Sequence, residues 1–72
     1  MMDRLQLLRI ALIAQGLTVR AFCQRINVSP TVLYEVIAGT ATSARVSEEI
    51  ERAISEGLRR LRPYLEEEST PQ

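Results

Sequence analysis

Histidine and tryptophan are absent from the 72 residues, and cysteine occurs once, at Cys23. Without histidine the chain lacks the usual general base and the commonest metal ligand, so we expect neither an enzyme nor a metal or cofactor site. A lone cysteine excludes a disulfide within the chain and fits a reducing compartment. Because there are only three aromatic residues, aliphatic side chains must supply most of the core.

Long hydrophobic runs are also scarce. The most apolar stretch, residues 5–17, is interrupted by Gln6 and Arg9. It is shorter than the roughly 20 residues that are needed to span a bilayer. No small-residue cleavage site follows it, which disfavours a secretory signal. We therefore expect a cytoplasmic protein with no membrane partner.

Net charge is lacking too, because nine basic residues, all arginine, balance nine acidic ones. The balance hides an uneven distribution. Residues 1–45 carry a net charge of +3, and residues 46–72 carry −3. A basic front half and an acidic rear half are compatible with binding phosphate on one face, while the rear half limits nonspecific binding.

Capping residues and hydrophobic spacing predict three helices in the first part of the chain, over residues 3–15, 19–26 and 30–38. Thr18 and Ser29 are favoured N-cap residues for the second and third helices, and Pro30 suits the first position of the third. Gly16 and Gly39 are typical of helix ends. The first part of the chain is therefore predicted to be all-α.

A fourth helix has the clearest apolar stripe, made of Val46, Ile50, Ala53, Ile54, Gly57, Leu58 and Leu61. Either Ser43 or Ser47 caps its start. Gly57 either lies within this helix or ends it and begins a short fifth helix. Pro63 should prevent extension past Arg62. We expect one domain over residues 1–62 and an acidic, flexible tail over residues 63–72.

Apolar residues surround the first helix almost completely, which is typical of a helix that is buried on two sides. In so small a domain, the second side predicts contact with another subunit. The leucines at the end of the fourth helix extend its stripe beyond the four-helix unit. We therefore predict a homodimer whose interface contains Leu7, Ile10, Leu58, Leu61 and Leu65.

The segment TVRAFCQRINVSPTVLYEVIAG, residues 18–39, consists of two short capped helices joined by a turn. Cys23 stands where the helices would cross, as a small packing residue, and Asn27 stands at the turn, where it accepts a left-handed backbone. This register resembles the helix-turn-helix of lambda-repressor-like (xenobiotic-response-element type) regulators, especially small phage- and prophage-encoded members. That family usually has alanine and glycine where this chain has Cys23 and Asn27.

The resemblance covers residues 5–56. It implies an all-α, lambda-repressor-like helix-turn-helix domain of four to five helices. It also implies a sequence-specific transcription regulator, with repression expected, that binds double-stranded DNA. No small-molecule ligand is expected, because no room remains for a ligand-binding domain.

In this register the helix from Ser29 to Ala38 enters the major groove. Pro30 and Val32 would contact thymine methyl groups, Thr31 a base edge or phosphate, and Glu35 a cytosine amino group. Glu35 is otherwise a solvated helix residue, and Tyr34 either packs beside the helix or contacts phosphate. The remaining predicted contacts are to the DNA backbone, from Thr18, Arg20, Ser29, Thr40, Thr42, Ser43 and Arg45.

Two other functions fit the same sequence. One is a DNA-packaging, excision or antitoxin-type module with a larger protein partner. The other is a protein-interaction domain whose third helix no longer binds DNA, which the zero net charge and the apolar Val32 outside the core would favour. No catalytic constellation supports an enzyme.

Overall fold

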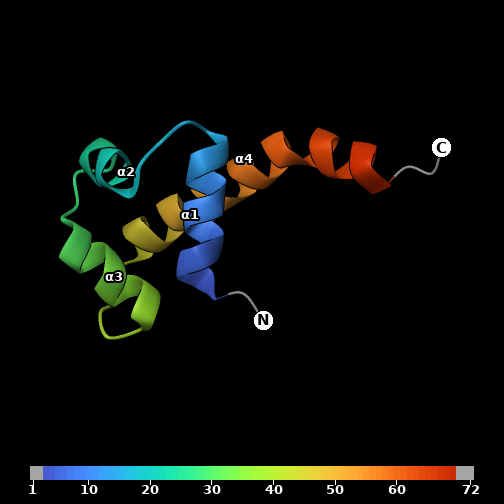
Figure 1. Ribbon diagram of the computed structural model, residues 1–72. Helices are drawn as coiled ribbons and strands as arrows, with labels where there is room; N and C mark the ends of the chain where they lie inside the picture. The colour runs from blue at the N-terminus through green and yellow to red at the C-terminus, as the bar shows by residue number, and fades with distance from the viewer. Residues whose placement is uncertain (1–2, 70–72) are drawn as a thin grey trace.

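The computed structural model describes residues 3–69, and for residues 66–69 it describes only the backbone. This part of the chain holds four α-helices and no strand, as the sequence predicts for an all-α fold (Figure 1). The helices are α1 (Arg4–Ala14), α2 (Val19–Arg25), α3 (Pro30–Ala38) and α4 (Ala44–Ser69). The first three agree with the predicted ranges to within one residue at each end.

A side-chain cap begins each of the four described helices. The Asp3 carboxylate accepts a hydrogen bond from the Gln6 backbone N–H at 2.8 Å, at the start of α1. At the start of α4, the Ser43 hydroxyl oxygen accepts from the Val46 N–H at 3.3 Å, whereas Ser47 lies inside the helix. Of the two candidate caps, Ser43 is therefore the one used. Each cap satisfies an N–H group that has no partner within its helix.

The core consists of aliphatic side chains, one phenylalanine and one cysteine, and all four helices contribute to it. Its buried members are Leu8, Leu12, Phe22, Cys23, Ile26, Leu33, Val46, Ile50, Ala53 and Ile54. Within residues 3–65, no polar or charged residue is buried. The helices α2 and α3 pack at one end of the crossed pair α1 and α4 (Figure 1). Hydrophobic burial is therefore the main stabilising term for this domain.

Gly57 lies inside α4 and does not end it, so the alternative of a fifth helix is wrong. A Cβ atom at this position would overlap the backbone and the side chain of Ala11 in α1. Beside this contact, the Gln15 side-chain amide donates to the backbone oxygens of Ala11 at 3.1 Å and Ala53 at 2.8 Å. The glycine is thus required for a close helix crossing, and its backbone remains helical.

The prediction that Pro63 ends the fourth helix at Arg62 is wrong, because α4 continues through Pro63 to Ser69. Proline removes only its own N–H donor and blocks the carbonyl of residue 59, so the turns on either side keep their hydrogen bonds. Pro63 is exposed, and no packed neighbour has to shift to accept its ring. A domain boundary at residue 62 stays a prediction, and residues 70–72 of the predicted tail lie outside the described residues.

The second half of α4 projects away from the other helices (Figure 1), and the molecule measures 47 × 24 × 16 Å. Across residues 3–69, no single helix is both long enough and apolar enough to cross a membrane. The helices α1 and α2 meet the length and composition criteria only when they are combined, and a bend of 85° separates them.

We predict that Gly57→Ala destabilises the domain, although alanine is otherwise favoured over glycine in a helix. The added methyl group must displace the backbone of α1, and overpacking of this kind costs about 1–3 kcal/mol. Urea unfolding followed by circular dichroism measures the loss. The matched control is Ser55→Ala, which is exposed in the same helix. Equal stability of the Gly57→Ala and wild-type proteins would contradict the close crossing.

Candidate nucleic-acid interface

The turn between α2 and α3 is held by local hydrogen bonds and by one left-handed residue. Asn27 has a φ of 58°, and the Val28 N–H donates to the Cys23 carbonyl at 2.9 Å. The Thr18 hydroxyl oxygen accepts from the Ala21 N–H at 3.0 Å, and the Ser29 hydroxyl oxygen accepts from the Val32 N–H at 3.2 Å. The predicted conformation of Asn27 and both predicted caps are confirmed. Together they fix how α3 leaves α2.

One face of α3 packs on the core and the opposite face is exposed. Leu33 is fully buried, and Val36 and Ile37 are half-buried against the same core. The exposed residues are Pro30, Thr31, Val32, Tyr34, Glu35 and Ala38. The four side chains that were predicted to face outward for base contact, at positions 30, 31, 32 and 35, are all exposed.

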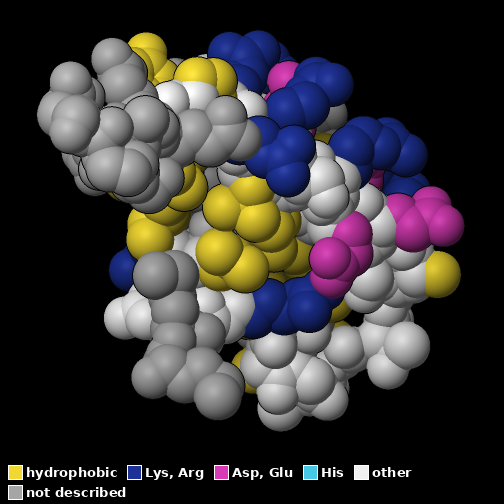
Figure 2. All heavy atoms as spheres, turned by 90° about the vertical axis from the view of Figure 1, so that its right-hand side faces the viewer, with side chains coloured by type: hydrophobic (Ala, Val, Ile, Leu, Met, Phe, Trp, Pro, Cys, Tyr) yellow, Lys and Arg dark blue, Asp and Glu magenta, His cyan; other side chains and the backbone are white. Residues whose placement is uncertain are grey.

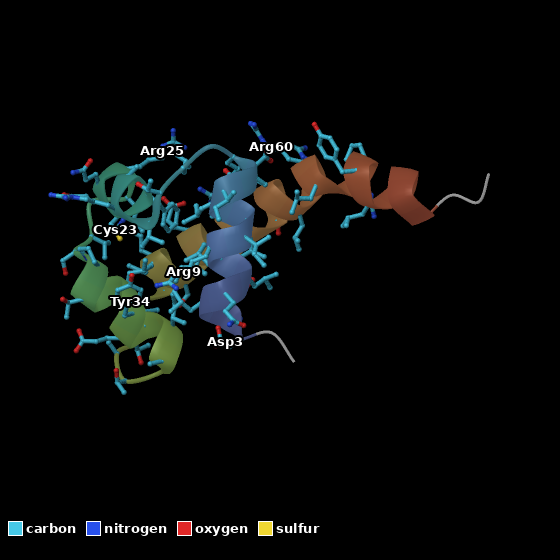
Figure 3. The ribbon with its side chains drawn as sticks, in the orientation of Figure 1. Asp3, Arg9, Cys23, Arg25, Tyr34 and Arg60 are labelled. Atoms are coloured by element: carbon cyan, nitrogen blue, oxygen red, sulfur yellow. The ribbon has the colours of Figure 1, made fainter. Side chains whose placement is uncertain are left out.

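A hollow separates α2 from α3 on the exposed side of the pair. Val19, Cys23, Val28 and Pro30 form its apolar lining, and Arg20, Gln24 and Tyr34 add polar groups. Figure 3 labels Cys23 on α2 and Tyr34 on α3. The structure therefore brings Arg20 and Tyr34 together, although they lie on different helices. It also adds Gln24, which the sequence prediction missed because an isolated amide on a surface helix has no distinctive spacing.

Cys23 lies between the two helices with almost no exposed surface. Burial raises the pKa of the Cys23 thiol, which keeps it protonated and unreactive. This placement agrees with the predicted packing role. Among the described residues, no group of three or more acidic, cysteine or histidine side chains could hold a metal ion.

The predicted backbone contacts Thr18, Ser29, Thr40 and Ser43 already make hydrogen bonds within the chain. The hydroxyl oxygens of Thr18, Ser29 and Ser43 accept from backbone N–H groups, so each hydroxyl proton is still available for donation. The Thr40 hydroxyl instead donates to the Glu35 carbonyl at 3.2 Å. Thr42 is exposed in the loop before α4.

Arg45 has a structural partner that the sequence prediction did not anticipate. Its guanidinium donates to the Ile26 carbonyl, at the end of α2, with an N–O distance of 2.8 Å. This contact joins the start of α4 to the turn before α3. A cation is also favourable at the C-terminus of a helix. The contact of Arg45 with phosphate stays a prediction, whereas its role in positioning α2 is visible in the structure.

The five residues predicted for a dimer interface come from α1 and from the second half of α4, and we call them the apolar elbow: Leu7, Ile10, Leu58, Leu61 and Leu65. Leu7 packs partly against the core, and Leu61 is half-buried. Ile10, Leu58 and Leu65 are 38%, 41% and 58% exposed. Figure 2 shows hydrophobic side chains gathered on the face from which α4 projects, between arginine side chains.

Ion pairs join α1 to α4 and also form within the second half of α4. Arg4 of α1 pairs with Glu51 of α4. Farther along α4, Arg59 and Arg60 both pair with Glu56, at 2.6 and 3.3 Å. The hydrogen bonds from Arg59 and Arg60 lower the pKa of the Glu56 carboxyl group.

Comparisons with protein-family models, with curated proteins and with solved structures gave no match for this chain.

We expect Arg45→Met to lower the free energy of unfolding by about 1 kcal/mol, because the Ile26 carbonyl would lose its charged donor. Chemical denaturation at fixed ionic strength measures this change. The control is Arg25→Met, which removes an exposed arginine from α2. If both variants match the wild-type protein, the Arg45 hydrogen bond does not stabilise the end of α2.

Proposed function

We propose that this chain is a lambda-repressor-like helix-turn-helix regulator that binds double-stranded DNA through the exposed face of α3. The observation that carries the proposal is the division of α3 into two faces. Leu33 on one face of α3 is buried in the core, while Thr31, Val32 and Glu35 on the other face are exposed. A helix presented in this way fits the roughly 12 Å width of the major groove. The preceding helix would then cross the DNA backbone.

Two exposed hydrogen-bond donors on α2 support this orientation. Arg20 and Gln24 are exposed and line the hollow beside α3, on the side where Tyr34 also lies. Arginine and glutamine side chains both donate hydrogen bonds to phosphate oxygens. With α3 in the groove, these two side chains would reach the adjacent strand. Transcriptional repression by occupation of an operator is the role that such a small DNA-binding domain serves most directly.

A second candidate is a protein-interaction domain that uses the same helix. Val32 is 39% exposed, and within residues 30–38 the only charged residue is the acidic Glu35. A recognition helix without a cation contributes little electrostatic attraction to DNA. Binding would then depend on the arginines of the neighbouring elements.

Selection from a library of random duplexes tests the proposal. Wild-type protein should enrich one motif over successive rounds. Val32→Asp is the matched variant, because it places a second carboxylate on an exposed position of α3 and should abolish the enrichment through repulsion of phosphate. Circular dichroism checks that this variant stays helical. A wild-type protein that enriches no motif would overturn the proposal and leave the protein-interaction domain as the better account.

Phosphate contact and base contact should separate in two further variants. Arg20→Ala should weaken binding to every duplex alike and make the salt dependence shallower by about one unit in the log–log slope. Glu35→Ala should relax preference at one base pair, where a well-placed contact discriminates by about 1–3 kcal/mol. Titrations of the selected site, its single-base variants and random duplex at two salt concentrations measure both effects. An unchanged preference profile for Glu35→Ala would show that Glu35 is only a solvated residue.

We also propose that two chains associate through the apolar elbow and place two copies of α3 on inverted half-sites. The half-sites would lie about one helical turn apart. Within the chain, the projecting half of α4 leaves Leu58 and Leu65 exposed. A twofold pairing of this surface would bury the same residues from both copies.

Light scattering at micromolar concentration should report about twice the 8.1 kDa chain mass. Leu65→Glu and Ile10→Glu should return the protein to the monomer without loss of helicity, because both side chains are exposed. Ile13→Glu is the matched control: Ile13 is 73% exposed on α1 and lies outside the elbow. A wild-type monomer, even with DNA bound, would contradict the proposed dimer.

A further inference from the structure

The exposed face of α3 has an unusual set of functional groups for a DNA-reading helix. Residues 30–38 contain no arginine, lysine, asparagine or glutamine. The exposed side chains are apolar at Pro30, Val32 and Ala38, and they carry hydroxyl groups at Thr31 and Tyr34. Glu35 supplies the single charged group, and it is an acceptor. The helix therefore offers methyl groups, two hydroxyl groups and one carboxylate in place of guanidinium, ammonium or amide donors.

These groups match pyrimidines better than purines. Guanine presents N7 and O6 acceptors in the major groove and is read best by arginine or lysine, while adenine is read best by a side-chain amide. None of these residue types is present on α3. Thymine presents a C5-methyl group, which an apolar side chain can contact, and cytosine presents an N4 amino donor, which a carboxylate can accept.

Other hydroxyl groups lie at the ends of α3. The Ser29 hydroxyl oxygen accepts from the Val32 N–H and keeps its proton for donation, whereas the Thr40 hydroxyl donates to the Glu35 carbonyl. Tyr34 lies at the flank of α3, on the hollow that it shares with Arg20 and Gln24 of α2. Charged and amide donors are therefore grouped on the α2 side of the interface, and the exposed face of α3 keeps the Thr31 hydroxyl as a donor. Val32 and Glu35, three residues apart on one helix, remain at the exposed face.

We propose that α3 reads pyrimidines: Val32 contacts the C5-methyl group of a thymine, and Glu35 accepts from the N4 amino group of a cytosine. This inference rests on the proposed function. Side chains three apart on a helix lie about 5–6 Å from each other. Successive bases on one strand are about 3.4 Å apart. The two contacted bases therefore lie one or two steps apart in each half-site.

Uracil substitution isolates the thymine methyl group, because uracil keeps every hydrogen-bonding group of thymine. In the selected duplex, thymines are replaced one at a time by uracil, and the dissociation constant is measured for wild type and for Val32→Ala. At one position per half-site, uracil should weaken wild-type binding about fourfold, the value of one buried methyl group. The same duplex should not weaken Val32→Ala any further.

A second arm restores the methyl group on a different base. Replacing the critical thymine·adenine pair by cytosine·guanine should weaken binding, and 5-methylcytosine at that position should recover about fourfold. Val32→Ala should show no such recovery. Ile13→Ala, which changes an exposed residue of α1, is the control and should respond to both modified bases as the wild type does.

For the cytosine contact, Glu35→Ala should lose its preference at a cytosine one or two steps from the critical thymine. The proposal fails if no uracil duplex binds more weakly, or if uracil weakens wild type and Val32→Ala equally. Selective binding would then still support the proposed function. If no duplex of any sequence is bound, both proposals fail together.

Discussion

Where α1 crosses α4, Gly57 lies against the backbone of Ala11, and only a hydrogen atom fits in place of a side chain. The Gln15 amide joins the same two helices through two backbone oxygens. This close crossing sets the direction of α4 and brings Ile50 and Ile54 into one core with the leucines of α1. Every other element is placed relative to that core, because the domain contains no disulfide and no buried ion pair within residues 3–65.

The placement of α2 and α3 depends on this core in two ways. Leu33 and Phe22 enter the core from α3 and α2, and Arg45 ties the beginning of α4 to the end of α2. The turn itself is fixed locally by Asn27 and by the caps at Thr18 and Ser29. Rigid placement of this kind lowers the entropy that a binding helix would otherwise lose on contact with its partner. The face of α3 opposite to the core is therefore exposed and available for the DNA contact that we propose.

Local signals in the sequence predicted the helices of the first half well, since caps and hydrophobic spacing act within a few residues. These signals failed at Pro63, because the helix continues despite the loss of the one backbone hydrogen bond that proline cannot donate. They left the role of Gly57 undecided, because that role depends on contact with Ala11, which is distant in the chain. The hydrogen bond from the Arg45 guanidinium to the Ile26 carbonyl joins the start of α4 to the end of α2, and the local sequence of neither helix predicts it. The outward-facing residues of α3 were predicted from the register that the resemblance to helix-turn-helix regulators implies, whereas Gln24 became a candidate only through the shared hollow.

Amide chemical shifts of the ¹⁵N-labelled protein test the central claim, that the exposed face of α3 contacts duplex DNA. Spectra are recorded with the selected duplex and with a scrambled duplex of equal length and composition. The account predicts that the selected duplex shifts the amides of residues 31–38 most, together with those of Arg20 and Gln24, and that the scrambled duplex shifts residues 31–38 far less. Shifts confined to the apolar elbow, or equal shifts with both duplexes, would contradict it.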